Sequence, residues 1–130
     1  LAGHCFVDDG AIIGGLSAVL QFARVGKHAF VGGMSGIAQD LPPWMLAVGN
    51  RALVQSPNIV GLRRAKAPQE LVTAFKQAFR QVWHSGLPRP DALYQLEAEY
   101  GHLPEIMEFV AFIRQSERGI LPAEDRKKDE

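Results

Sequence analysis

The amino-acid sequence predicts a triangular parallel β-helix that is followed by a C-terminal α-helical domain. Two observations support this prediction. Over residues 1–37, aliphatic and small side chains each recur at every sixth position. From residue 68 onward, the apolar side chains instead follow the spacing of amphipathic helices. The length of 130 residues suits one domain, or one small domain with an appendage.

The six-residue period consists of two columns of side chains. The aliphatic column is Leu1, Val7, Ile13, Val19, Val25, Val31 and Ile37. The column of small residues is Cys5, Ala11, Ser17, Ala23, Ala29 and Ser35. A period of six fits neither a helix, which repeats about every 3.6 residues, nor a single amphipathic strand, which repeats about every 2. It fits a solenoid with six residues on each of three sides, so that one coil takes about 18 residues and its strands stack about 4.8 Å apart.

The direction of coiling follows from the type of repeat rather than from its period. Hexapeptide solenoids coil left-handed, against the usual preference for right-handed crossovers, so the expected fold class is a left-handed parallel β-helix. A β-meander with chance spacing and a general mixed α+β domain are the alternatives, and neither explains the two columns. Residues 1–37 make only two coils, whereas about three repeats are needed for a stable core. We therefore expect further coils before Leu1.

The domain boundaries follow from where each pattern ends. Pro42 and Pro43 interrupt the six-residue period, and residues 45–50 read as a last strand and turn. We therefore assign residues 1–50 to the last coils of the β-helix and residues 51–67 to a connecting loop. Residues 68–121 form the helical domain, with about three helices that begin near residues 68, 90 and 104. The last nine residues, 122–130, hold seven charges and predict a disordered tail.

The composition excludes several classes of function. Fourteen basic residues balance fourteen acidic ones, so no overall field attracts nucleic acid or an anionic membrane. No apolar run approaches the roughly 20 residues that span a bilayer, and the N-terminus does not resemble a signal peptide.

The single cysteine, Cys5, forms no intrachain disulfide, and packing in the column of small residues explains it better than a nucleophilic role. Because the chain lacks an initiator Met, we expect it to be part of a longer protein.

Few residues suggest chemistry on their own. None of the four histidines forms a pair with metal-ligand spacing, and no phosphate-binding Gly-Lys-Ser/Thr loop is present, so we expect no metal or cofactor. His4 precedes the inward Cys5, so its side chain can face outward, and Gly3 beside it exposes a backbone N–H that could stabilise an oxyanion. Arg63 and Arg64 could bind a pyrophosphate through bidentate hydrogen bonds. A surface histidine and a solvated arginine pair are the alternatives.

Several segments, taken together, carry a family resemblance. They are residues 1–4 (LAGH), 8–15 (DDGAIIGG), 31–43 (VGGMSGIAQDLPP), 49–50 (GN), 58–64 (NIVGLRR) and 116–119 (SERG). In these segments the chain resembles the UDP-N-acetylglucosamine O-acyltransferases. The similarity covers residues 1 to about 120 in unbroken order, including the helical end. It is more specific than the hexapeptide repeat, which many acyl and acetyl transferases share.

The resemblance implies a cytoplasmic homotrimer with active sites in clefts between neighbouring solenoids. The family reaction moves a 3-hydroxyacyl group from acyl carrier protein to the 3-hydroxyl of UDP-N-acetylglucosamine, the first step of lipid A synthesis. The family's general-base histidine lies upstream of this chain, so residues 1–130 alone are expected to be inactive. Gly3 matches the glycine whose N–H holds the oxyanion, and His4 and Gln21 match substrate-contacting residues. Asn58 and Arg64 match residues that contact the acyl or nucleotide part of the ligand.

The sequence departs from the family pattern at three polar positions. Leu20 replaces a histidine, Val60 replaces a glutamate and Ala65 replaces an arginine. These changes leave two alternatives to the family reaction. One is a divergent enzyme with another nucleotide-sugar acceptor, and the other is a non-catalytic trimeric scaffold or carrier-protein-binding module.

Overall fold

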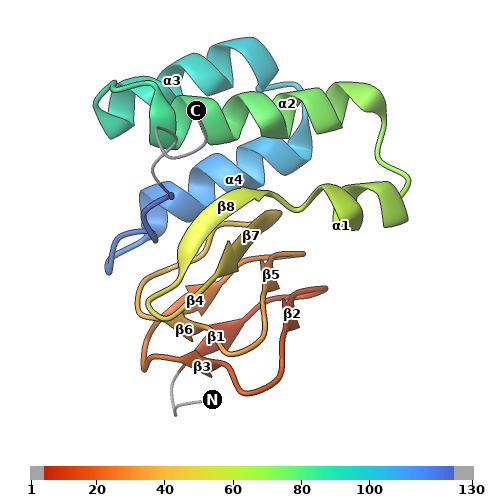
Figure 1. Cartoon of the computed structure of the whole chain (residues 1–130). Coiled ribbons are helices and arrows are strands. Elements are labelled where there is room, and N and C mark those ends of the chain that lie inside the picture. Colours follow the sequence, from red (N-terminus) through yellow and green to blue (C-terminus); the bar gives the residue numbers. More distant parts are fainter. Residues whose placement is uncertain (1–4, 125–130) are drawn as a thin grey trace.

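The computed structural model describes residues 5–124 as a parallel β-solenoid with a layer of helices over one end (Figure 1). The strands are β1 (Phe6–Val7), β2 (Ile12–Ile13), β3 (Ala18–Val19), β4 (Arg24–Val25), β5 (Phe30–Val31), β6 (Gly36–Ile37), β7 (Met45–Val48) and β8 (Leu53–Pro57). The helices are α1 (Ile59–Arg64), α2 (Gln69–Phe79), α3 (Arg89–Tyr100) and α4 (Pro104–Gln115), and a π-helical turn, Arg80–His84, continues α2. Within residues 5–124, no helix is long and apolar enough to span a membrane.

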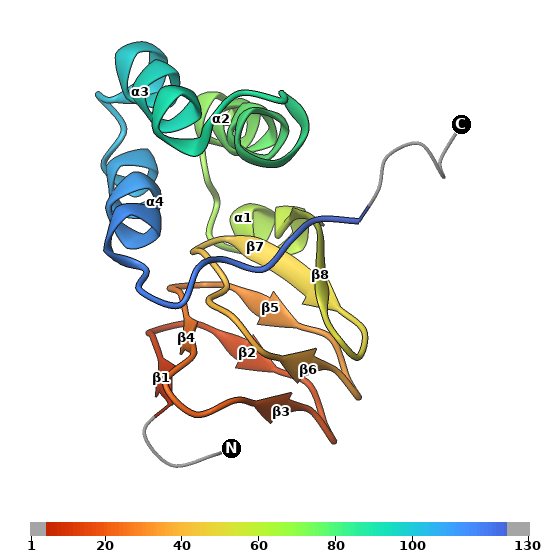
Figure 2. The same ribbon diagram turned by 90° about the vertical axis from the view of Figure 1, so that its left-hand side faces the viewer.

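The strands form the three sides of a triangular stack. β1 pairs with β4, β2 with β5, and β3 with β6, all in parallel, and each pair joins residues one coil of 18 positions apart. Figure 2 shows the paired strands one above the other. Backbone hydrogen bonds continue through the stack, as from Ile12 N–H to the Ala29 carbonyl at 2.9 Å. The structure therefore confirms the coil length that the six-residue period predicts.

From Val19 to Ile37, both predicted columns point into the solenoid. Val19, Val25, Val31 and Ile37 are buried, as are Ala23, Ala29 and Ser35. The column residues of the coil at residues 5–18 are less completely buried. Among the described residues, only the following coil packs against them. The serines fit the interior because hydrogen bonds satisfy them: the Ser17 hydroxyl donates to the Gly32 carbonyl at 2.8 Å, and the Gly49 N–H donates to the Ser35 hydroxyl at 3.0 Å.

The segment 51–67 differs from the expected loop. It contains β8, which pairs with β7 in the antiparallel direction, and α1, which begins directly after β8. A strand forms here because β7 ends the parallel stack and its outer edge carries unpaired backbone groups. Strand β8 satisfies these groups and covers the end of the solenoid.

The helical layer packs on this covered end through aromatic side chains. The Trp44 ring lies 6.1 Å from that of Phe75 on α2, and Phe75 meets Phe109 on α4 edge-on at 5.9 Å. Trp83 also contacts Phe109, at 6.3 Å between ring centroids. Such contacts add to the burial of apolar area. The three helices expected between residues 68 and 121 are thus joined to the solenoid by one apolar core.

The segment after α4 returns to the solenoid. Ile120 forms a parallel bridge with Asp40, and Ala123 forms one with Val54 of β8. The Trp83 indole N–H donates to the Leu121 carbonyl at 2.9 Å. Residues 122–124, which the charge pattern assigns to a disordered tail, are therefore paired in the structure, because β8 offers them a free strand edge. Residues 125–130 of the expected tail lie outside the described residues.

Candidate functional site

A groove of about 570 Å³ lies between α1 and the solenoid side formed by β2, β5 and β7. Its lining residues are Gly10, Ile12, His28, Phe30, Leu46, Asn58, Val60, Gly61, Arg64 and Ala65. The solenoid contributes the apolar wall, and α1 contributes most of the opposite wall. Concave, largely apolar surfaces with a few polar groups are typical of small-molecule sites.

Asn58 links the two walls of the groove. Its side-chain oxygen accepts from the Gly61 N–H at 3.0 Å and so caps α1. Its side-chain amide donates to the His28 carbonyl at 2.9 Å, and its backbone N–H donates to the Trp44 carbonyl at 2.7 Å. Asn58 is 9% exposed. The predicted substrate-contacting residue therefore also fixes α1 against the solenoid.

Arg64 lies at the last turn of α1, exposed, and lines the groove. The neighbouring Arg63 is exposed as well but does not line it. Among the described lining residues there is no carboxylate, so the positive charge of Arg64 is not offset inside the groove. An apolar groove with an arginine at one end suits an anionic ligand that has an apolar part.

His28 is a groove residue that the sequence reading did not single out. Its ring stacks on Trp44, with centroids 4.2 Å apart and an interplanar angle of 18°. Its backbone has a φ of 57°, and its N–H donates to the Asp9 carbonyl at 3.0 Å. A sequence signal exists, because Gly10, Leu16, Phe22, His28 and Met34 recur every six residues and all have positive φ. These five side chains differ in size and polarity, so this column is hard to recognise from the sequence.

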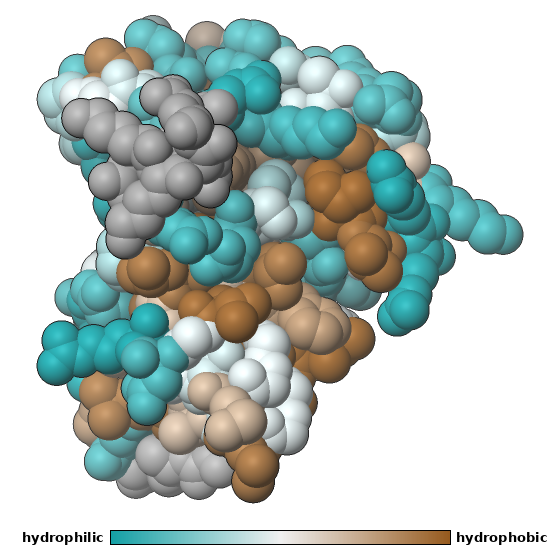
Figure 3. Space-filling view, in the orientation of Figure 1, coloured by the Kyte–Doolittle hydropathy of each residue, from teal (hydrophilic) through white to brown (hydrophobic). Residues whose placement is uncertain are grey.

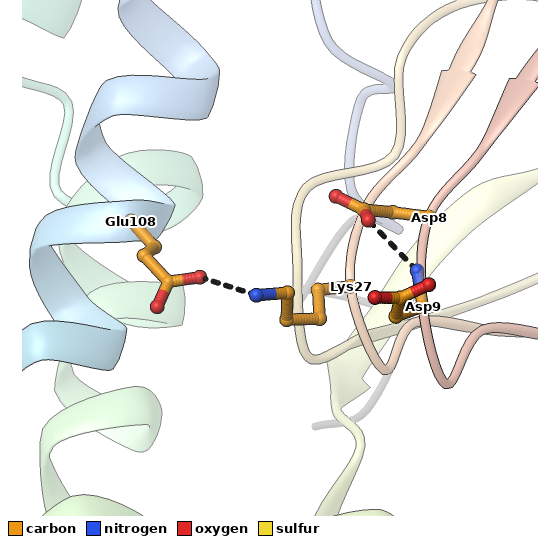
Figure 4. A network of polar contacts seen from close by, with 4 residues as sticks. All are labelled: Asp8, Asp9, Lys27 and Glu108. Atoms are coloured by element: carbon orange, nitrogen blue, oxygen red, sulfur yellow. Dashed lines mark hydrogen bonds and ion pairs between the residues drawn. The ribbon is translucent and has the colours of Figure 1, made fainter.

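The turn beside this histidine also connects the solenoid to the helices. The Lys27 ammonium lies 3.3 Å from the Glu108 carboxylate on α4, with Asp8 and Asp9 close by (Figure 4). The hydrogen bond to Glu108, and then the attraction of its charge, raise the pKa of Lys27 above its ordinary value. Because the side chains of Lys27 and Glu108 are 39% and 50% exposed, water screens this pair.

Gln21 does not line the groove. It occupies the turn between β3 and β4, whereas the groove follows β2, β5 and β7. Leu20 lines a separate hollow of about 370 Å³ against β3 and β6. Of the other predicted site residues, Gly3 and His4 lie outside the described residues. Within one chain, the structure thus brings together Asn58 and Arg64 but leaves Gln21 apart from them.

Hydrophobic side chains are exposed on the solenoid. On the face shown in Figure 3, hydrophobic surface gathers over the solenoid and its junction with the helices, while hydrophilic surface covers most of the helical layer. Leu16, Phe22 and Met34 are 89%, 63% and 71% exposed at turns between the strands. Large apolar side chains that protrude in this way are typical of an interaction surface.

Sequence comparison identifies relatives with a common function. The model of the family described as "Udp N-acetylglucosamine O-acyltransferase; Domain 2" matches residues 40–121. An acyl-[acyl-carrier-protein]--UDP-N-acetylglucosamine O-acyltransferase of Anaeromyxobacter dehalogenans is 44% identical over 120 residues, which cover 92% of this chain and 47% of the relative. One of Burkholderia orbicola is 40% identical over 125 residues, which cover 93% and 48%. The chain spans about half the length of these curated relatives.

Solved structures give the same result. The UDP-N-acetylglucosamine O-acyltransferase of Moraxella catarrhalis superposes with a TM-score of 0.87 at 35% identity, covering 92% of this chain and 46% of that one. The acyltransferase of Bacteroides fragilis superposes with a TM-score of 0.83 at 38% identity, covering 89% and 45%.

Proposed function

The chain belongs to the UDP-N-acetylglucosamine O-acyltransferase family, and we propose that it forms the C-terminal part of an enzyme that carries out the reaction for which the family is named. This enzyme transfers a 3-hydroxyacyl group from acyl carrier protein to the 3-hydroxyl of UDP-N-acetylglucosamine, the first step of lipid A synthesis. The observation that carries the proposal is the groove, because it combines an apolar wall with Arg64 and Asn58, two residues that match the family's ligand contacts.

The proposed roles divide between an upstream histidine, the first coil of this chain and helix α1. A histidine upstream of residue 1 acts as the general base on the sugar hydroxyl. The backbone N–H of Gly3 stabilises the oxyanion of the tetrahedral intermediate, and His4 and Gln21 contact the substrate. Arg64 binds the pyrophosphate, whose oxygens match the geometry of a guanidinium group. The reaction requires no cofactor, because the thioester of the carrier protein already activates the acyl group.

A homotrimer of left-handed β-helices would complete the site. Gln21 lies at the turn between β3 and β4, whereas the groove lies along the side formed by β2, β5 and β7, so they can face the same ligand only if neighbouring solenoids contribute one of these parts each. The exposed apolar side chains at the turns, such as Leu16 and Met34, support such an interface because contact would remove them from water. We place this trimer in the cytoplasm.

A second candidate function is acylation of a different nucleotide sugar. Val60 and Ala65, which replace a glutamate and an arginine of the family pattern, both line the groove. The loss of two polar groups from one wall changes which acceptor can satisfy its hydrogen bonds there. Leu20, the third departure, is half-exposed beside Gln21.

Acyl transfer by the longest native form of the chain tests the proposal. The protein is incubated with 3-hydroxyacyl carrier protein and UDP-N-acetylglucosamine, and the acylated nucleotide sugar is measured by mass spectrometry. Product formation supports the family reaction. If only another nucleotide sugar is acylated, the second candidate replaces it. If a folded trimer binds nucleotide sugar or carrier protein without turnover, the protein is a scaffold or binding module and both enzymatic proposals fail.

A further inference from the structure

The His28 ring is held between two neighbouring coils. The coil that follows places Trp44 against one face, at 4.2 Å between ring centroids. The coil that precedes places Gly10 against the ring so closely that a Cβ atom at Gly10 would lie 2.4 Å from the His28 Nδ1. Because Trp44 covers one face of the ring and Gly10 crowds its Nδ1–Cε1 part, the edge that carries Nε2 is the part best placed to meet a ligand. An imidazole edge forms hydrogen bonds rather than stacking contacts.

The backbone of His28 is fixed as firmly as its ring. Its N–H donates to the Asp9 carbonyl at 3.0 Å, and its carbonyl accepts from the Asn58 amide at 2.9 Å. Trp44 in turn is 7% exposed and packs near Phe75. A side chain held in this way loses little rotamer freedom when a ligand binds, which favours affinity.

The groove offers a ligand few other polar side chains. Among the described lining residues, the side chains that can form strong hydrogen bonds belong to His28, Asn58 and Arg64. Asn58 is almost buried, and its amide oxygen and nitrogen each already have a partner inside the fold. His28 and Arg64 are therefore the side chains best placed to recognise a polar ligand.

We propose that His28 is a ligand-contacting residue of the groove, and that an N–H on the edge of its ring donates a hydrogen bond to a pyrophosphate oxygen of the nucleotide sugar. This inference rests on the proposed function, which places a nucleotide sugar in the groove. A phosphate oxygen is the fitting acceptor because no carboxylate lines the groove within the described residues and Arg64 lines the same groove. In this assignment Asn58 is a positioning residue that holds His28 and α1 in place.

Binding of UDP-N-acetylglucosamine and of UDP by calorimetry, in the longest native form of the chain, tests this inference. His28→Phe keeps a ring on Trp44 but removes the N–H donor. Phenylalanine suits this backbone, because Phe22 already adopts a φ of 69° at another turn. We expect the Kd of both ligands to rise about tenfold or more, as for the loss of a hydrogen bond to a charged group. His28→Gln, which retains an N–H donor, should restore part of the affinity.

The matched control is His102→Phe, since His102 lies on the surface beside Glu70, away from the groove. It should leave both Kd values unchanged. If the parent protein binds both ligands and His28→Phe binds them equally well, the contact is refuted while the proposed function stands. If the parent protein binds neither ligand, the proposed function fails together with the inference. Equal loss in the Phe and Gln variants would mean that an N–H donor at this position does not restore binding, and would also overturn the proposal.

Discussion

Asp40→Ala should separate the solenoid from the segment that follows α4. Asp40 is 1% exposed, and its two carboxylate oxygens serve different parts of the chain. One accepts from the Arg24 backbone N–H at 2.8 Å, and the other accepts from the Ser116 hydroxyl at 2.6 Å. An alanine at this position leaves both half-buried donors without that partner.

The magnitude follows from these two hydrogen bonds. Each one to a charged acceptor contributes about 1.5–3 kcal/mol, so we expect Asp40→Ala to lower the free energy of unfolding by about 3–6 kcal/mol. Ser116→Ala removes one of them and leaves the Arg24 N–H bonded, so its cost should be about 1.5–3 kcal/mol. In the double variant the two losses should not add, because both substitutions remove the same hydrogen bond.

Urea unfolding, followed by circular dichroism and by tryptophan fluorescence, measures these values. Glu117→Ala is the control, because Glu117 is exposed beside Ser116 and surface substitutions of this kind change stability by about 0.5 kcal/mol or less. If Asp40→Ala unfolds at the same urea concentration as Glu117→Ala, the carboxylate does not join the two parts and the reasoning fails.

Three further predictions concern the groove and its surroundings. Arg64→Ala should weaken nucleotide-sugar binding, measured by calorimetry, about tenfold. Arg63→Ala should leave it unchanged, because Arg63 does not line the groove. If the two variants bind the nucleotide sugar equally well, Arg64 is not part of the site. Asn58→Asp keeps the oxygen that caps α1 but loses the amide group that donates to the His28 carbonyl. It should lower the free energy of unfolding, measured in urea, by about 1–3 kcal/mol. An unchanged free energy of unfolding would contradict the role of Asn58 as a link between α1 and the solenoid. The pKa of Lys27 is raised in the folded protein, so its ion pair with Glu108 stabilises the fold. This stabilisation is fully present below the pKa of an unfolded lysine, about 10.4, and it is lost as the pH rises through the higher pKa of Lys27 in the folded protein. Parent and Lys27→Met should therefore differ in thermal unfolding at neutral pH and converge in strong alkali, and a difference independent of pH would refute the pair.

The solenoid could be predicted from the sequence because its core repeats. Interior side chains at Val19, Val25, Val31 and Ile37 occupy equivalent environments, so the same size rule applies to each and becomes visible as a period. The helices could be predicted for a similar reason, since each buries one stripe along its length. A repeated environment leaves a repeated residue type.

Strand β8, the cap of α1 and the groove could not be predicted in the same way. Residues 51–67 carry no period, and Leu53–Pro57 becomes a strand only because β7 offers it an unpaired edge. Of the site, Asn58 and Arg64 came from the family resemblance, whereas the link that Asn58 makes to the solenoid depends on a hydrogen bond to the carbonyl of the distant His28. The similar positive φ values of Leu16 and His28 likewise left no common side chain to recognise.

Strand β8 also bears on how the protein is made. Its antiparallel direction ends the parallel stack, and its own free edge is bonded by the segment after α4: the Val54 N–H donates to the Pro122 carbonyl at 2.9 Å, and the Glu124 N–H donates to the Val54 carbonyl at 3.1 Å. These partners are synthesised long after β8. A nascent chain therefore leaves that edge open until residue 124 has emerged from the ribosome, and open strand edges pair readily with other chains. The open β8 edge is therefore a site at which the nascent chain can aggregate, and slow or interrupted synthesis of the helical segment prolongs that period.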